Sequence, residues 1–501
     1  MTKLVERLPV SAPGLAIYGV LWVAIALQFD YATATTASMD TLWQSLGTEY
    51  LSSDPIGSLS VLHIQPWGVN ALYALDLYLT PSSHLFLLIF FGLAGAGSIF
   101  LLCATLVRTG IPHTWALGAG VILALLPGTV LYAFWPYNVT LIAFLVALSV
   151  WGIALVKTRP MAGATVSALG VLGMQLLRST FVWVFVLAWC VFLVVLLARR
   201  NRGRKLVAAL LPVVAVAAIS VASQLYYFAQ YNLPAMSSWS GQNVAKALLT
   251  SGQLSVTDAA REEISQDPCL ASLLEAYETQ TLNVWDPGGL VQLPGCQEIA
   301  VDSATGVAAW DQDFRSDGAM NYNSRLALAA SGEWTRMMTI IIRSDPFQLV
   351  RMATSTDTGP RSSGIGIYLD PSDEFPWIDE QRAVLPLGSV TGLLSIVFAP
   401  ALIVLIVIGA VQAIVVRGSL LRKNIVYWGA LGIVVFHAVA STLAEYAENM
   451  RFRAEIDPLL LLLAVMSLYA LLAGSRSVPV QDLSEQVLSE QEIKEIASRD
   501  N

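Results

Sequence analysis

The stretch SHLFLLIFFGLAGAGSIFLLCATLV, residues 83–107, decides the fold class, because it contains no Asp, Glu, Lys or Arg. About 20 apolar residues in a helix are enough to cross a hydrocarbon core of about 30 Å. Similar runs recur along a chain that is 55% hydrophobic and 13% charged, whereas soluble domains have about 25% charged residues. We therefore expect an all-α polytopic membrane protein that lies in a lipid bilayer.

Ten such runs follow one another along the chain, and each is long enough for a transmembrane helix. The fifth and sixth runs are separated by little more than Arg178. The predicted spans cover residues 13–29, 83–107, 115–134, 138–156, 161–177, 180–198, 206–228, 388–416, 425–444 and 456–474.

Charged residues are distributed unequally between the predicted loops. With a cytoplasmic N-terminus, the basic run RRNRGRK at 199–205 is also cytoplasmic, whereas the first outer loop, 30–82, has acidic residues but no Lys or Arg. This asymmetry follows the positive-inside rule. We expect both termini in the cytoplasm and a bacterial inner membrane as the location. The net charge of −8 argues against a nucleic-acid partner.

The predicted spans divide the chain into four parts. These are an N-terminal membrane module of seven helices (1–228), an extracytoplasmic domain (229–387), a C-terminal module of three helices (388–474) and a polar cytoplasmic tail (475–501). In the second part, SVTDAAREEISQ (255–266) and GEWTRMMTIIIRSDPFQLVRMATS (332–355) have helical spacing. We therefore expect the extracytoplasmic domain to be mostly helical.

Two of the four cysteines, Cys269 and Cys296, lie in the predicted extracytoplasmic domain. An oxidising compartment favours a disulfide between them; the alternative is two free thiols. Because the other two, Cys103 and Cys190, lie in apolar spans, we expect them to be packing residues. The sequence has no Cys and His cluster with zinc-site spacing, and we predict no metal site from it.

Asp40 is the first polar residue that could take part in chemistry, because it follows the first span in TASMDTLWQSL. A carboxylate at this point could act as a general base for an attacking hydroxyl. The alternative is that it caps the helix that its neighbours predict, and the residues alone favour this alternative.

The stretch SVLHIQPWGVNALYAL (60–75) places His63, Gln65 and Asn70 in an apolar context. If residues 58–79 form a helix along the membrane interface, its polar groups face water and could hold a sugar or a phosphate. The alternative is an interfacial anchor, with Trp67 and His63 at the level of the lipid headgroups.

The segment LAEYAENMRFRAEIDPLL (443–460) alternates charges just before the last apolar run, and it contains Glu448, Arg451 and Arg453. A guanidinium is suited to a phosphate, and a lipid-linked phosphate would lie at this depth. Arg178, between two spans, is a second cation of this kind. The alternatives are interfacial anchoring and snorkelling.

Taken in order, these motifs resemble the GT-C superfamily of polytopic glycosyltransferases, which use polyprenyl-phosphate sugars and include protein mannosyltransferases and aminoarabinose transferases. The motifs are the acidic residue Asp40, the LHxQPxxxN-type stretch, Arg178 in RSTF, SSWSGQNVAK (237–246) and ENMRFRAEIDPLLLLL (448–463). The resemblance follows the chain order from end to end. Its most specific element is Arg451-Phe452-Arg453 followed by Pro458-Leu459.

The resemblance implies an inverting transfer of a sugar from a polyprenyl-phosphate donor to the hydroxyl of a glycan, lipid or protein acceptor on the outer face. In this scheme Asp40 is the catalytic base, and Arg451, Arg453 and Arg178 bind the donor phosphate. His63, Gln65, Asn70 and Glu448 line the substrate cleft.

The sequence departs from the family pattern at two positions. Trp67 replaces the second proline of the stretch, and Asp40 stands alone where the family often has an acidic pair. The second departure leaves a requirement for a divalent cation open, with Asp30 and Glu49 as further acidic candidates.

Three other functions compete with a GT-C transferase. A transporter or flippase of lipid-linked sugars would need ionisable residues inside its spans, and His437 is the residue to check. A non-catalytic membrane scaffold would not depend on Asp40. An O-antigen-type ligase would have its essential residues mainly in the large loop.

Overall fold

The computed structural model describes residues 9–200, 203–233, 236–299, 304–354, 388–416, 419–444 and 449–473. In these ranges the chain is helical, and the one pairing of extended residues is an isolated antiparallel bridge between Phe314 and Met320. The predicted all-α class is confirmed.

Five helices are long and apolar enough to cross a membrane. These spans are Leu85–Arg108 (α7), Val139–Val156 (α10), Pro160–Leu177 (α11), Lys205–Tyr231 in α13 (Arg204–Tyr231) and Arg453–Ala473 in α24 (Asn449–Ala473). Two bent pairs raise the number to seven if each pair is one span. The first joins α2 (Ala12–Ala26) to α3 (Tyr31–Thr41) at 84°, and the second joins α8 (His113–Leu125) to Gly128–Phe134 at 64°.

The three remaining runs also form apolar helices, but their described apolar parts are shorter than these spans. They are α12 (Trp183–Arg200), α22 (Gly388–Val415) and α23 (Ile425–Ala444). The structure therefore supports five to seven membrane-spanning helices, where the sequence predicts ten.

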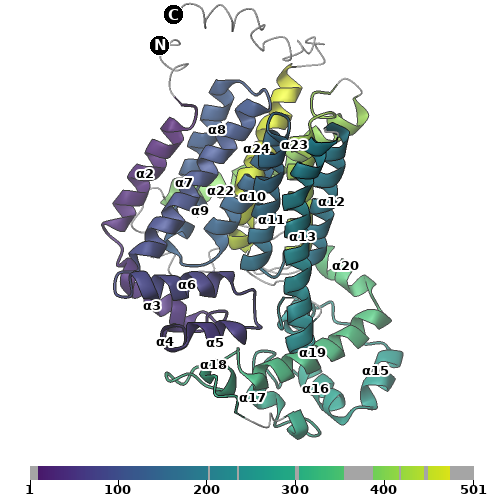
Figure 1. Cartoon of the computed structure of the whole chain (residues 1–501). Helices are drawn as coiled ribbons and strands as arrows, with labels where there is room; N and C mark the ends of the chain where they lie inside the picture. Colours follow the sequence, from purple (N-terminus) through teal and green to yellow (C-terminus); the bar gives the residue numbers. More distant parts are fainter. Residues whose placement is uncertain are drawn as a thin grey trace, which may run out of the picture.

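Small residues allow α10 and α11 to pack closely. A Cβ atom on Gly152 of α10 would lie 2.5 Å from the backbone nitrogen of Ser167, and one on Gly163 of α11 would lie 2.5 Å from that of Val156. Glycine at such positions lets two membrane helices approach to backbone contact. The pair forms the centre of the bundle in Figure 1.

The first loop folds into short helices after the bend at the end of α2. They are α3, α4 (Thr48–Ser53), α5 (Pro55–Ser60) and α6 (Gly68–Leu79). The expected continuous helix over 58–79 is wrong, because residues 61–67 are not helical. Pro66 explains part of this break, since a proline disfavours helical backbone at the preceding residue. Figure 1 shows α3–α6 together at one end of the bundle.

A second set of helices follows α13 and packs around its own core at the same end of the bundle (Figure 1). We call residues 236–354 the helical module. Its helices are α14 (Ser240–Thr250), α15 (Asp258–Ser265), α16 (Pro268–Glu278), α17 (Pro287–Leu290), α18 (Ala308–Asp311), α19 (Arg325–Ser344) and α20 (Phe347–Thr354). Trp334 and Ile341 of α19 are central to that core, and a disulfide joins Cys269 to Cys296. Residues 355–387 and the tail 475–501 lie outside the described residues.

Candidate functional site

Side chains that are distant in sequence hold the segment between α3 and α4 in place. Gln65 Nε2 and Asn70 Nδ2 both donate to the carbonyl oxygen of Gln44, at 3.0 and 3.1 Å. Asn70 Oδ1 accepts from the backbone N–H of Leu46 at 2.9 Å. Gln65 and Asn70 are buried. They therefore fix residues 40–48, which we call the clamped loop, instead of facing water as expected for an interfacial helix.

His63 is fully buried and joins the same stretch to the helical module. Its Nε2 lies 3.2 Å from the carbonyl oxygen of Ser324, and its Nδ1 lies 2.9 Å from Ser238 Oγ. A carbonyl oxygen only accepts, so Nε2 carries the proton and Nδ1 accepts from the serine hydroxyl. Burial lowers the pKa of His63 to about 4, so the ring is neutral at pH 7. His63 is a structural link in this arrangement, and neither sequence-based role describes its contacts.

Asp40 lies on the last turn of α3, at the start of the clamped loop. Its Oδ1 accepts two hydrogen bonds from Thr48, from the backbone N–H and from the hydroxyl, both at 2.8 Å. Asp40 therefore satisfies the first backbone N–H of α4 from eight residues away. The local helix start that its neighbours predict is not there, because Asp40 lies inside α3. The side chain is half-buried, and it retains a second oxygen, Oδ2, for a further contact.

Sequence reasoning missed Arg315, which links the helical module to the clamped loop. Its guanidinium donates to the carbonyl oxygens of Asp40 and Ser45, both at 2.5 Å. Arg315 is 7% exposed, and burial lowers the pKa of its guanidinium. A Cβ atom on Gly47 would lie 3.4 Å from Arg315 Nη1 and 3.6 Å from Asp40 Oδ1, so the cation and the carboxylate flank this glycine.

A second polar group occupies the start of α24. Arg178, directly after α11, forms a buried ion pair with Glu455, and the other oxygen of Glu455 lies 2.9 Å from His437 Nε2 of α23. The three side chains are all at least nine-tenths buried. Arg178 therefore ties α11 to α24, and its guanidinium has a carboxylate partner where a phosphate contact was expected.

Arg453 lies two residues before Glu455 and is 7% exposed. Its Nε is 3.7 Å from Asp457 Oδ1, whereas its buried Nη1 has no hydrogen-bond partner in the described part of the chain. Leaving a buried charged donor unsatisfied is costly, so this nitrogen is suited to an anionic ligand. Glu448 lies outside the described residues, and so does the side chain of Arg451.

Two hydrogen bonds link the stretch around Gln65, which holds the clamped loop, to the end of α11. Tyr137 donates from its hydroxyl to Gln65 Oε1 at 3.1 Å. The next residue, Asn138, donates from Nδ2 to the carbonyl oxygen of Leu177 at 3.2 Å. Because Leu177 directly precedes Arg178, the stretch around Gln65 lies between the end of α11 and the clamped loop.

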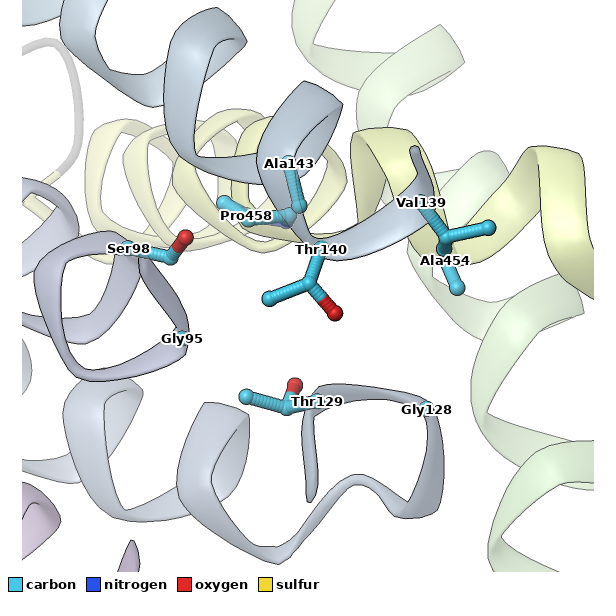
Figure 2. A pocket seen from close by; sticks show the side chains of 9 residues that line it. All are labelled: Gly95, Ser98, Gly128, Thr129, Val139, Thr140, Ala143, Ala454 and Pro458. Atoms are coloured by element: carbon cyan, nitrogen blue, oxygen red, sulfur yellow. The ribbon is translucent and has the colours of Figure 1, made fainter. Parts of the chain in front are cut away.

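A small hollow adjoins this region between α7, α9 (Pro127–Leu131), α10 and α24. Figure 2 shows the side chains of Thr129 and Thr140 on its walls, with Ala454 and Pro458 of α24 beside them. Its volume is about 10 Å³, which is roughly the space that one water molecule needs. The hollow is therefore too small for a sugar or a prenyl chain.

A further chain of polar groups fixes α3 near the bend. Asp76 Oδ2 lies 2.5 Å from His84 Nδ1, and His84 Nε2 lies 2.9 Å from Thr36 Oγ1. Asp76 and His84 are buried, and Thr36 precedes Asp40 by four residues, which places both on one face of α3. These contacts hold the helix that carries Asp40 against the start of α7.

No group of three or more His, Cys, Asp or Glu side chains in the described ranges could hold a metal ion. Comparisons of the chain with protein-family models, with curated proteins and with solved structures find no match.

Proposed function

We propose that the protein is a membrane glycosyltransferase of GT-C type. It would transfer a sugar from a polyprenyl-phosphate donor to an acceptor hydroxyl, with inversion. We also propose that all ten apolar helices span the membrane, and that the clamped loop and the helical module lie on its extracytoplasmic face.

The buried Nη1 of Arg453 carries this proposal, because it lies at one end of an apolar helix and lacks a partner among the described residues. A monophosphate on a lipid would supply the missing anion at that depth. Glu455 already neutralises Arg178, so we assign the phosphate contact to Arg453 and the positioning of α24 to Arg178.

Asp40 completes the proposed chemistry. Its Oδ1 is held by Thr48, which leaves Oδ2 to accept the proton of the acceptor hydroxyl. The acceptor oxygen then bonds to the anomeric carbon, the bond from that carbon to the phosphate oxygen breaks, and the polyprenyl phosphate leaves. Arg453 stabilises the negative charge that develops on the phosphate.

The test uses the full chain in nanodiscs with a panel of radiolabelled polyprenyl-phosphate sugars. We expect Asp40→Asn to bind one of these donors as the wild type does and to transfer sugar at least about a hundredfold more slowly. Asp54→Asn is the matched control, because Asp54 Oδ1 also caps a helix, through the N–H of Gly57 at 2.9 Å. This control should retain full activity.

Arg453→Lys retains a positive charge but loses the forked donor, so we expect weaker donor binding. Arg422→Ala, an exposed arginine before α23, should leave donor binding unchanged. The proposal fails if none of the donors binds, or if Asp40→Asn transfers sugar as fast as Asp54→Asn.

A transporter of lipid-linked sugars is the second candidate, and the buried network of Arg178, Glu455 and His437 supports it. Ionisable residues within membrane helices often mark a transport path. A transporter would move the labelled lipid across a proteoliposome membrane without releasing its sugar. A loss of this movement in Glu455→Gln, with no sugar transfer by the wild type, would favour transport over the transferase.

A further inference from the structure

Four aromatic residues meet beside the clamped loop. Trp43 comes from the loop itself, and the helical module contributes Trp239, Trp285 and Tyr322. The Trp43 ring centroid lies 5.4 Å from that of Tyr322, 5.9 Å from that of Trp285 and 6.4 Å from that of Trp239. Trp239 also contacts Trp285 at 4.8 Å. We call these four residues the aromatic cluster.

The members of the aromatic cluster differ in exposure. Trp239 and Tyr322 are 6% and 7% exposed, whereas Trp43 is 47% exposed. The Tyr322 hydroxyl donates to the carbonyl oxygen of Trp285 at 3.0 Å, which fixes the rings behind Trp43. Trp43 therefore packs against these rings on one side and is exposed on the other.

The backbone on both sides of Trp43 is also fixed. Gln44, the next residue, is held at its carbonyl oxygen by Gln65 and Asn70, and Arg315 holds the carbonyl oxygen of Asp40, three residues before. An aromatic ring that is ordered before a ligand arrives loses little conformational entropy on binding. The same clamps set the position of Trp43 relative to the carboxylate of Asp40.

We propose that the open face of Trp43 binds a sugar ring of the acceptor, so that the acceptor is a glycan; this assignment rests on the proposed transferase function. A pyranose has an apolar C–H face that packs flat on an aromatic ring, while its hydroxyl groups at the edge make hydrogen bonds. Trp43 follows Asp40 by three residues in the clamped loop, so a sugar ring stacked on Trp43 would lie beside the segment that carries the proposed base.

Polar groups beside the aromatic cluster suit the hydroxyl edge of a sugar. Asp286 directly follows Trp285 and brings a carboxylate next to the aromatic cluster, where its Oδ1 accepts from the backbone N–H of Gly289 at 2.8 Å. Ligand sites commonly combine aromatic walls with a few such polar groups. Anchoring in lipid is the competing role for an exposed tryptophan, but the rings that brace Trp43 all belong to the helical module.

The experiment measures glycan binding to the full chain in nanodiscs, without any donor, by saturation-transfer NMR. The probes are neutral oligosaccharides built from glucose, mannose, galactose or arabinose. We expect at least one of them to bind, and we expect Trp43→Ala to weaken its binding by about tenfold or more. Trp43→Phe retains an aromatic face and should recover most of the affinity.

Trp67→Ala is the matched control, because Trp67 is a comparably exposed tryptophan, at 42%, and is not part of the aromatic cluster. This variant should bind the oligosaccharide as the wild type does. The inference is overturned if none of these glycans binds, if Trp43→Ala binds as tightly as the wild type, or if Trp67→Ala is equally weakened. Quenching by brominated lipids that is clearly weaker in Trp43→Phe than in the wild type would assign Trp43 to the bilayer and would also overturn the inference.

Two further readouts separate this inference from the transferase proposal. Donor binding by Trp43→Ala should match the wild type, because the phosphate contact is assigned to Arg453. Glycan binding that depends on Trp43 in a protein that transfers no sugar would reject the transferase while retaining the sugar site. Sugar transfer that depends on Asp40 but not on Trp43 would reject the sugar site on Trp43 and would retain the transferase.

Discussion

At the scale of single residues, His63 makes the stability of the fold depend on pH. Its pKa falls from 6.5 in the unfolded chain to about 4 in the folded protein, because burial disfavours the charged ring. Between these two values the unfolded chain binds more protons. The neutral ring therefore contributes fully to the free energy of unfolding above about pH 6.5, and this contribution is lost as the pH falls towards 4. Its full size is about 3 kcal/mol.

The variant His63→Gln tests this contribution, because a glutamine can still hydrogen-bond to Ser238 and Ser324 but does not titrate. Thermal unfolding of wild type and variant in nanodiscs, measured from pH 7.5 to pH 4.5, should show the wild type losing more stability as the pH falls. Groups other than His63 titrate equally in both proteins and cancel. Parallel stability curves would contradict the prediction.

Sequence reasoning identified polar residues worth examining but could not assign their contacts. His63, Gln65 and Asn70 stand out because they interrupt an apolar chain. Their partners are either far away in sequence, such as Ser238 and Ser324, or are backbone carbonyls that no sequence pattern marks. Arg315 lies in an ordinary polar segment, so nothing in its neighbours distinguishes it from a solvated arginine.

At the scale of helices, the close packing of α10 on α11 depends on glycine. A Cβ atom on Gly163 would meet the backbone nitrogen of Val156 at 2.5 Å and the carbonyl oxygen of Gly152 at 2.7 Å. Backbone atoms of a helix cannot move aside singly, so Gly163→Ala must separate the helices. We expect a loss of about 1–3 kcal/mol in the free energy of unfolding.

Gly118 of α8 provides the control, because a Cβ atom there would meet nothing within 4 Å. Replacing glycine with alanine in an unobstructed helix stabilises it by about 0.5–1 kcal/mol, so Gly118→Ala should unfold at the wild-type temperature or slightly above. Thermal unfolding of both variants in one detergent makes the comparison. A Gly163→Ala protein as stable as Gly118→Ala would show that the two helices are not packed as described.

The apolar runs predicted where helices lie, because twenty consecutive apolar residues leave few alternatives in a bilayer. They did not predict how a helix ends or bends. The 84° turn between α2 and α3 and the break at residues 61–67 depend on contacts with the helical module and with α7. Hydropathy carries no information about those contacts.

At the scale of the whole molecule, the disulfide and the charge asymmetry are two independent indications of how the chain is oriented in the membrane. Cys269 and Cys296 are joined within the helical module, and disulfides persist in oxidising compartments. The basic run at 199–205 favours the cytoplasmic side for the connection between α12 and α13. Both features agree if α13 crosses the membrane between them.

Single cysteines on the two faces test this orientation and the number of spans. Glu262 is exposed on α15, and Lys423 is exposed between α22 and α23. The wild type should give little background labelling, since Cys103 and Cys190 are buried and the other two cysteines form the disulfide.

In spheroplasts of a bacterial host, an impermeant maleimide should label Glu262→Cys at once and Lys423→Cys only after permeabilisation. One predicted span, 388–416, lies between the two positions, so opposite accessibility requires α22 to cross the membrane. Labelling of both variants from the same side would remove α22 from the spans and would place Lys423 on the same face as the helical module.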